Sequence, residues 1–252
     1  MGLQPHAKVI LASGSPRRKE LLESIGIDFS VWVPEVDETL APGWSPAEAV
    51  EQLAYRKGRA VAEQVLREPS PFAFEPAVSA TVNIELPVLV IAADTIVVLD
   101  GEVMGKPADA EEACRMLRRL SGRQHEVYSG LAVFCADKTA TGETVPGLSG
   151  GHSAVPLADI GGYRIAATSP GGKPSVLVGH TVSKVTFGPM TEEEIEAYVK
   201  TGEPLDKAGA YGIQGNGAVF IEKIEGDFFS IMGLPLRLLY RMLQALEMRL
   251  VF

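Results

Sequence analysis

The feature that most constrains the fold is an uninterrupted apolar run in the middle of the chain, Val88 to Ala93. A run that is apolar at every position is typical of a strand buried on both of its faces. Helix and strand signals alternate on either side of it, which favours an α/β protein. The sequence therefore predicts a mixed α/β fold with this strand in its interior.

Local signals place the other elements around that strand. Helices are expected from Pro16 to about Ile25, from the capping box at Ser45 to about Leu66, from the capping box at Asp109 to Leu120, from Thr191 through Val199, and from about Pro235 to Leu246. Strands are expected at residues 9–12, 29–33, 125–135, 181–187 and 218–224, with a hairpin from 96 to 104 that turns at Asp100-Gly101. Two stretches rich in small residues and proline, 68–87 and 140–180, are expected to be surface insertions with little core.

Composition narrows the class of protein further. The chain has 252 residues, of which 46% are hydrophobic, enough for one large domain or two lobes. Its net charge of −9 disfavours non-specific binding to nucleic acid, which depends on neutralising phosphates. The longest apolar run, Leu86 to Leu99, is too short to span a membrane and contains Asp94. With no secretory signal and two thiols that suit a reducing compartment, Cys114 and Cys135, we expect a soluble cytoplasmic protein.

The start of the first helix carries an unusual charge pattern. Ser15 is a favourable N-cap and Pro16 suits the first helical position, but the cations Arg17 to Lys19 fill the first turn. Because a helix start is already partly positive, carboxylates normally stabilise it, by ~0.3–1 kcal/mol each. A strand, a turn of small residues and a cationic helix start form a cradle for phosphate. The alternative is a solvated basic turn, offset by the two glutamates that follow.

Asp94 directly follows the apolar run, and we expect it at the carboxyl end of that strand, where open α/β sheets bind ligands. A carboxylate there can hold a divalent cation or act as a general base toward water. The alternative is an aspartate that only caps the following turn. Lys57 and Lys106 are candidates of lower specificity, since surface lysines are common.

A second distinctive segment, Gly202 to Gly215, mixes four glycines and two alanines with several polar residues. Such a loop lets the backbone approach a ligand closely, and the amide of Gln214 offers a donor and an acceptor to the edge of a base. The segment is neither a Walker A loop nor a dinucleotide fingerprint.

Together these segments resemble the Maf family of nucleoside triphosphate pyrophosphatases. The blocks that carry the resemblance are residues 11–22, Ala92-Ala93-Asp94-Thr95, Gly105-Lys106-Pro107, Leu120-Ser121-Gly122-Arg123 and residues 202–215. The resemblance implies one domain over residues 1–252, with two lobes around a mixed twisted sheet and a substrate cleft between them. It implies hydrolysis of a nucleoside triphosphate to the monophosphate and pyrophosphate, and Thr95 with Gln214 looks like the dTTP/UTP branch.

The resemblance and the residue chemistry together assign roles. Asp94 is the expected catalytic base and shares a Mg²⁺ or Mn²⁺ ion, for which Glu35 and Asp37 are further candidate ligands unless that acidic stretch is merely solvated. The expected substrate-binding residues are Ser13, Ser15, Arg17, Arg18, Lys57, Thr95, Lys106, Lys207 and Gln214. The expected partner is a small-molecule nucleoside triphosphate, with no membrane or nucleic acid and with a homodimer as the common assembly.

Two other functions stay open from the sequence. One is a nucleotide-binding regulator of cell division that does not turn its ligand over. The other is a different phosphate-handling enzyme, such as a sugar-nucleotide phosphatase, which would release orthophosphate in place of pyrophosphate.

Overall fold

The computed structural model describes residues 2–67, 86–136 and 154–251. Its strands are β1 (Gly2–Gln4), β2 (Lys8–Leu11), β3 (Phe29–Val31), β4 (Val88–Leu99), β5 (Glu102–Met104), β6 (Gln124–Ala136), β7 (Val155–Pro156), β8 (Gly161–Thr168), β9 (Pro174–Phe187), β10 (Ile221–Glu225) and β11 (Arg249–Val251). Its α-helices are α1 (Pro16–Ser24), α2 (Pro46–Arg67), α3 (Ala110–Leu120), α4 (Glu192–Lys200), α5 (Phe228–Met232) and α6 (Leu236–Ala245). Three 3₁₀ helices lie between α4 and β10: η3 (Glu203–Asp206), η4 (Ala208–Ala210) and η5 (Gly215–Phe220).

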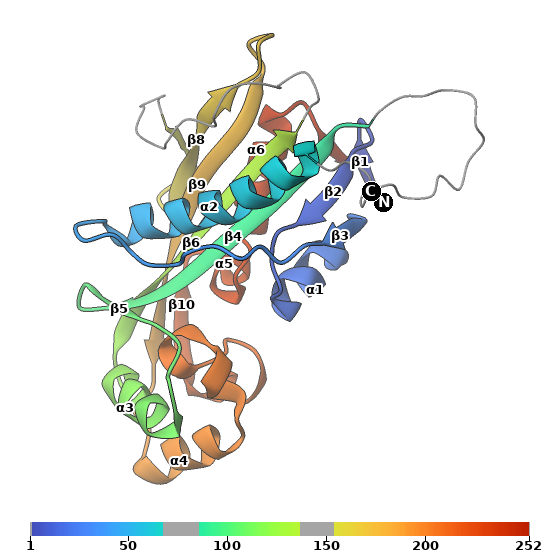
Figure 1. The fold of residues 1–252 in the computed structure, drawn as a ribbon. Coiled ribbons are helices and arrows are strands. Elements are labelled where there is room, and N and C mark those ends of the chain that lie inside the picture. The colour runs from blue at the N-terminus through green and yellow to red at the C-terminus, as the bar shows by residue number, and fades with distance from the viewer. Residues whose placement is uncertain (1, 68–85, 137–153, 252) are drawn as a thin grey trace.

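A mixed sheet in the order β3-β2-β4-β6-β9-β8-β7 forms the centre of the fold, with β5 added to β4 and β10 to β9. The predicted apolar strand is β4, which runs parallel to β2 and antiparallel to β6. Strands β4, β6 and β9 are long and run from the part of the molecule that carries α2 and α6 toward the part that carries α3 and α4 (Figure 1). The predicted mixed α/β class is therefore confirmed.

Alternate residues of the long strands face different helices, as the two-residue period of a strand requires. Leu89 and Ile91 of β4 pack with α6 in one core cluster, whereas Val90 and Ala92 pack with α2 in another. At the other end of the strands, α3 and α4 pack together with Val97, Leu99 and the 3₁₀ segment (Figure 1). The helices thus form two groups on one continuous sheet, one with α2 and α6 and the other with α3 and α4.

Most local signals identified the right elements. The capping boxes at Ser45 and Thr191 are present, and the hairpin pairs Val97 with Met104 and Leu99 with Glu102. The prediction of a strand at 218–224 is wrong in its first half, because residues 215–220 form η5 before β10 begins.

None of the helices in the described ranges is long and apolar enough to cross a membrane.

The expectation that residues 140–180 carry little core is wrong for the part that the structure describes. Strands β7, β8 and the first half of β9 lie in the main sheet, and Tyr163, Leu177 and Val178 are buried. Three of the glycines that suggested a loop, Gly161, Gly162 and Gly179, are required by close packing, since a Cβ at Gly179 would lie 2.2 Å from a carbonyl oxygen of β8. Residues 137–153 and most of the other expected insertion, 68–85, lie outside the described residues.

Helix α2 lies directly on the sheet at Gly130, where a Cβ would lie only 2.1 Å from the carbonyl oxygen of Val50. In the register of the sheet, Gly130 pairs with Asp94 on one side and with His180 on the other. On the His180 side, the buried carboxylate of Glu51 accepts a hydrogen bond from the His180 ring at 2.7 Å and pairs with Arg164. These contacts hold α2 against three neighbouring strands, β6, β9 and β8, and fix its distance from the sheet.

We predict that Gly130→Ala destabilises the protein by about 1–3 kcal/mol, because the added methyl group would collide with helix backbone that cannot move alone. Urea unfolding of the two proteins measures the difference. Gly171→Ala is the matched control, since its nearest atom would be 3.9 Å away and its stability should change little. Equal losses in the two variants would contradict the close contact.

Candidate functional site

The site lies where the sheet leaves one edge of β4 open. Strand β2 pairs with β4 only as far as Ile91, and β5 begins to pair at Val97. Between these two points, residues 92–96 have no strand neighbour on that side within the described chain. Asp94 and Thr95 occupy this open stretch and point to opposite faces. Asp94 is therefore not at a strand end as predicted, because pairing with β6 carries β4 on to Leu99.

On the α2 face, Asp94 is paired with Lys57. The Lys57 Nζ lies 2.6 Å from the Asp94 carboxylate and 3.0 Å from that of Glu38. The side chains of Lys57 and Asp94 are 12% and 11% exposed, whereas that of Glu38 is 61% exposed. A nearly buried carboxylate is costly without a counter-charge, and the Lys57 ammonium supplies it.

On the other face, Arg18 ties α1 to β4 and to the α5–α6 junction. Its Nε donates to the Gly233 carbonyl at 2.8 Å, its Nη1 to the Ser13 hydroxyl at 3.1 Å, and its Nη2 approaches Thr95 Oγ1 at 3.5 Å. Burial lowers the pKa of Arg18, and the negative charge of Asp94 opposes that change. Since an arginine keeps its proton even then, a fixed positive charge lies beside the open edge of β4.

The hydroxyl of Thr95 belongs to a short chain of hydrogen bonds. Ser129 Oγ donates to the Ser230 carbonyl at 2.6 Å, so in the 2.9 Å contact between the two hydroxyls Thr95 is the donor. With its proton committed to Ser129, Thr95 can offer a ligand only an accepting lone pair.

The start of α1 keeps free donors. Ser15 is at the N-cap position as predicted, but its side chain forms no capping hydrogen bond, and its backbone N–H donates to Ser13 Oγ at 3.2 Å. The first turn contains no acidic residue. The backbone N–H groups of Arg17 and Arg18 have no acceptor among the hydrogen bonds of the described residues. This helix start therefore has the donors and the charge that favour an anion.

The glycine-rich segment forms the opposite side of the site. Lys207 is held within it, since its Nζ donates to the Glu203 carbonyl and to the Asp206 carboxylate, both at 2.6 Å. The Gly209 N–H donates to the Gly105 carbonyl at 3.0 Å, which brings the exposed Lys106 beside this segment. Gln214 is exposed at the N-cap of η5.

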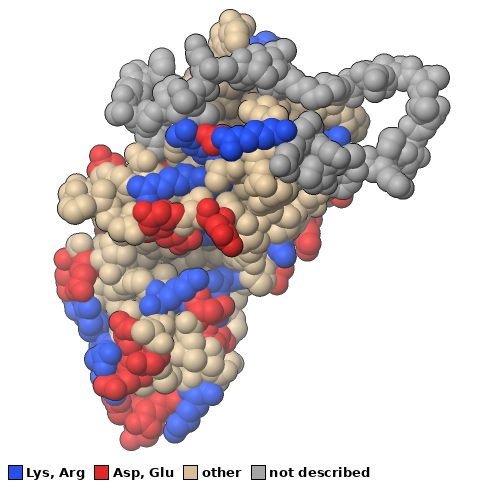
Figure 2. Space-filling view, viewed as in Figure 1, with Lys and Arg blue, Asp and Glu red and all other residues tan. Residues whose placement is uncertain are grey.

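Charge interactions connect the two sides. Burial raises the pKa of Tyr198, at the end of α4, and the positive charge of Arg17 opposes this increase. Burial also raises the pKa of Asp206, but Lys207 and the charge of Arg17 lower it below its usual value. The positive charge of Arg17 on α1 thus acts on Tyr198 and on Asp206 of the glycine-rich segment. Basic and acidic side chains lie near one another across the middle of the face in Figure 2.

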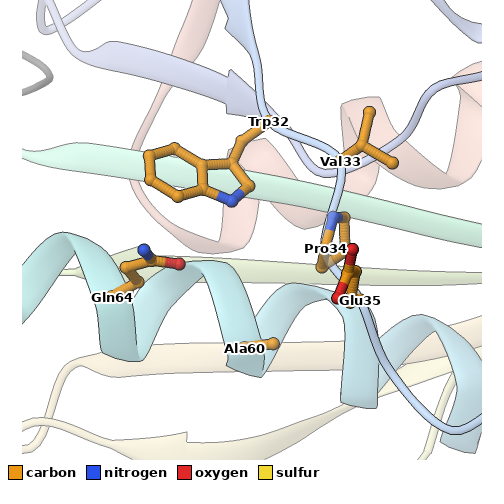
Figure 3. A pocket seen from close by; sticks show the side chains of 6 residues that line it. All are labelled: Trp32, Val33, Pro34, Glu35, Ala60 and Gln64. Carbon is orange, nitrogen blue, oxygen red and sulfur yellow. The ribbon is translucent and has the colours of Figure 1, made fainter.

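The two expected acidic ligands, Glu35 and Asp37, have contacts of their own in the segment after β3. Glu35 lines a hollow of about 330 Å³ between the segment after β3 and α2, opposite Ala60 and Gln64 (Figure 3). Asp37 accepts a hydrogen bond from the Thr39 N–H at 2.9 Å, and its bonds with Thr39 hold the pKa of its carboxyl low. In the part of the chain that the structure describes, no three His, Cys, Asp or Glu side chains lie close enough to hold a metal ion.

Sequence reasoning missed Glu38, the residue of the acidic stretch that does reach Lys57. The signal was present, because Glu38 is adjacent to Asp37, but a loop has no periodicity that tells which carboxylate turns inward. It also missed Gly233 and Ser129, whose roles depend on contacts between segments far apart in the chain.

The fold and the site define a mixed α/β protein with a cluster of opposite charges at an open edge of its central strand. The Maf-like protein family matches residues 8–149 and 152–246. The chain therefore belongs to the Maf-like family.

Curated relatives are similar over nearly the whole chain. It is 43% identical over 236 residues, 94% of its length and 92% of the relative's, to a dTTP/UTP pyrophosphatase of Symbiobacterium thermophilum. It is 41% identical over 240 residues, 95% of its length and 96% of the relative's, to one of Bacillus cytotoxicus. A third, from Bacillus thuringiensis subsp. konkukian, is 40% identical over 237 residues, 94% of each chain.

The glycine-rich segment is anchored in the core by Tyr211, whose hydroxyl lies 2.7 Å from Nε2 of the buried His125. Nδ1 of His125 is buried without a partner within the described residues. Burial lowers the pKa of His125 to about 4, from a usual value of 6.5. The histidine is therefore neutral in the folded protein near pH 7.

We predict that stability falls as the pH drops from about 6.5 to about 4, because the unfolded chain protonates His125 while the folded protein does not. The loss from this group reaches roughly 3 kcal/mol at the acid end. Urea unfolding at several pH values measures it, and His125→Gln should reduce the slope. The exposed His6→Gln is the control; equal slopes for His125→Gln and the unchanged protein would contradict the prediction.

Proposed function

We propose that this protein is a nucleoside triphosphate pyrophosphatase that hydrolyses dTTP and UTP to the nucleoside monophosphate and pyrophosphate. The observation that carries the proposal is the Lys57–Asp94 pair at the open edge of β4, next to the uncapped, cationic start of α1. The names of the relatives support the same reaction. A regulator that only binds nucleotides is less well supported, because binding alone does not require a carboxylate held in this position.

In the proposed reaction, Asp94 orients a water molecule and accepts its proton as the water oxygen attacks the α-phosphorus. The bond from the α-phosphorus to the bridging oxygen breaks, and pyrophosphate leaves with that oxygen. Lys57 remains beside Asp94 and neutralises charge on the phosphates. Arg17, the free N–H groups of α1 and the hydroxyls of Ser13 and Ser15 bind the rest of the triphosphate.

The donor set is compatible with a Mg²⁺ or Mn²⁺ ion. Asp94 and Glu38 both reach one cationic group, the Lys57 ammonium, and magnesium is commonly held by one or two carboxylates together with substrate phosphates. When bound, the ion would polarise phosphate oxygens and offset their charge. We propose Asp94 and Glu38 as its protein ligands in place of Glu35 and Asp37.

On the opposite side, Gln214 would read the edge of the pyrimidine, with the accepting lone pair of Thr95 as a second contact. Lys106 and Lys207 would add positive charge at this side. The homodimer, the lack of nucleic acid binding and the cytoplasmic location stay predictions from the sequence.

We predict that Asp94→Asn lowers kcat for dTTP and UTP by about 100-fold or more, because an amide cannot accept the proton of water. Pyrophosphate and orthophosphate released in the presence of Mg²⁺ are measured separately. Asp28→Asn, an exposed site, is the control. Near-normal turnover by the folded Asp94→Asn protein would remove this residue from the mechanism, and orthophosphate as the primary product would refute α–β cleavage.

We predict that Gln214→Glu erodes the preference for pyrimidine triphosphates more than it slows the best substrate, because a carboxylate can accept but not donate. Values of kcat/KM for dTTP, UTP, CTP and the purine triphosphates test this. Gln244→Glu, on α6, serves as the control. An unchanged ranking of nucleotides would contradict a role for Gln214 in base recognition.

A further inference from the structure

The glycine-rich segment is folded around one internal carboxylate, that of Glu203. Its Oε1 accepts hydrogen bonds from the Tyr198 hydroxyl at 2.9 Å and from the Gly217 N–H at 3.2 Å. Its Oε2 accepts from the Asn216 N–H at 2.9 Å. Both oxygens of one side chain are thus used to hold the segment that follows Gln214.

Tyr198 extends this arrangement to the other side of Gln214. Its hydroxyl donates to Glu203 and accepts from the Gly212 N–H at 3.0 Å. The backbone is therefore fixed at Gly212, two residues before Gln214, and at Asn216, two residues after it. The side chain of Gln214 itself forms none of the hydrogen bonds recorded among the described residues and is exposed.

The glycines of the segment are needed for this close wrapping. Gly215 has a φ of +74°, and a Cβ there would lie 2.8 Å from Glu203 Oε2. A Cβ at Gly217 would lie 2.5 Å from the Tyr198 hydroxyl and from the Gly212 carbonyl oxygen. Larger residues at either position would push the backbone away from the carboxylate.

The carboxylate of Glu203 takes the place that a bound anion would have in this loop, because it accepts hydrogen bonds from the backbone N–H groups of the loop. Successive backbone N–H groups in a glycine-rich turn commonly bind phosphate. Here the N–H groups of Gly212, Asn216 and Gly217 already have partners inside the protein. The start of α1, by contrast, keeps its donors free. The phosphates of a ligand therefore have open donors at α1, and the loop is left to present a side chain.

We propose that Glu203, with Tyr198 as its partner, is the positioning residue that sets base selectivity by fixing the backbone on both sides of Gln214. A primary amide can rotate to match either a donor–acceptor or an acceptor–donor edge, so it discriminates between uracil and cytosine only when its surroundings fix it. This inference rests on the proposed function and names how that site selects its substrate.

The charge state of Glu203 agrees with this role. Burial raises the pKa of its carboxyl, but the hydrogen bonds from Asn216, Tyr198 and Gly217 outweigh burial and hold it below the usual value. Glu203 is therefore ionised near pH 7, and its bonds are charge-assisted, which makes them stronger than neutral ones.

The test is Glu203→Gln, which replaces one accepting oxygen with an NH₂ group that faces donors. Affinities for UTP and CTP are measured by calorimetry in the Asp94→Asn background, so that turnover does not enter. We expect the ratio of the two affinities to fall by about tenfold, the effect of losing one charge-assisted hydrogen bond. Tyr198→Phe should act in the same direction, and Glu193→Gln, exposed on α4, should leave the ratio unchanged.

Hydrogen exchange of residues 212–217, followed by mass spectrometry without nucleotide, reports the loop directly. Faster exchange in Glu203→Gln together with a reduced affinity ratio supports the proposal. Faster exchange with an unchanged ratio would make Glu203 purely structural and overturn it, and so would unchanged exchange. If Glu203→Gln does not fold, Tyr198→Phe decides by the same two readouts.

The two proposals can fail separately. A protein that prefers UTP over CTP in binding but releases no pyrophosphate would refute the proposed function and leave this selectivity test intact. A protein that hydrolyses UTP with the same base preference before and after Glu203→Gln would refute the inference alone.

Discussion

The site depends on the direct contact between the backbone of α2 and Gly130 of β6. Because this position has no side chain, the helix backbone comes down to the sheet, and the Lys57 ammonium reaches Asp94 at 2.6 Å. A side chain at position 130 would separate the two layers and with them the two charges. On the far side of the same glycine, Glu51 with His180 and Arg164 keeps the helix from shifting. The pair that we assign to catalysis is thus fixed by packing between backbones.

The two sides of the site handle their donors differently. At the start of α1, neither a carboxylate nor a capping side chain uses the free N–H groups, so positive potential remains available. In the glycine-rich segment, the carboxylate of Glu203 uses them internally. This asymmetry gives the proposed substrate a direction, with its phosphates toward α1 and α2 and its base toward Gln214.

Much of the fold was predictable from local patterns. The apolar run at Val88, the capping boxes at Ser45 and Thr191, and the Asp100-Gly101 turn each identified an element, because short-range backbone preferences determine them. Gly171 and Gly172 do lie in the turn between β8 and β9, but Gly161, Gly162 and Gly179 were misleading for the same reason. Glycine signals a turn locally, yet here it allows β8 and β9 to pack closely, and that requirement comes from residues distant in sequence.

The residues of the site show the same difference between what local sequence determines and what depends on tertiary contacts. The sequence by itself determined which segments carry the chemistry: the basic helix start, Asp94 with Thr95, Lys57 and the glycine-rich stretch with Gln214. Only the tertiary structure decided that Asp94 lies inside a strand at an open sheet edge, and that Glu38, not Asp37, reaches Lys57. It also decided that Lys207 and Glu203 turn inward while Gln214 turns out. Residue type and short-range spacing fix what a side chain can do, whereas its partner depends on backbone that arrives from elsewhere in the chain.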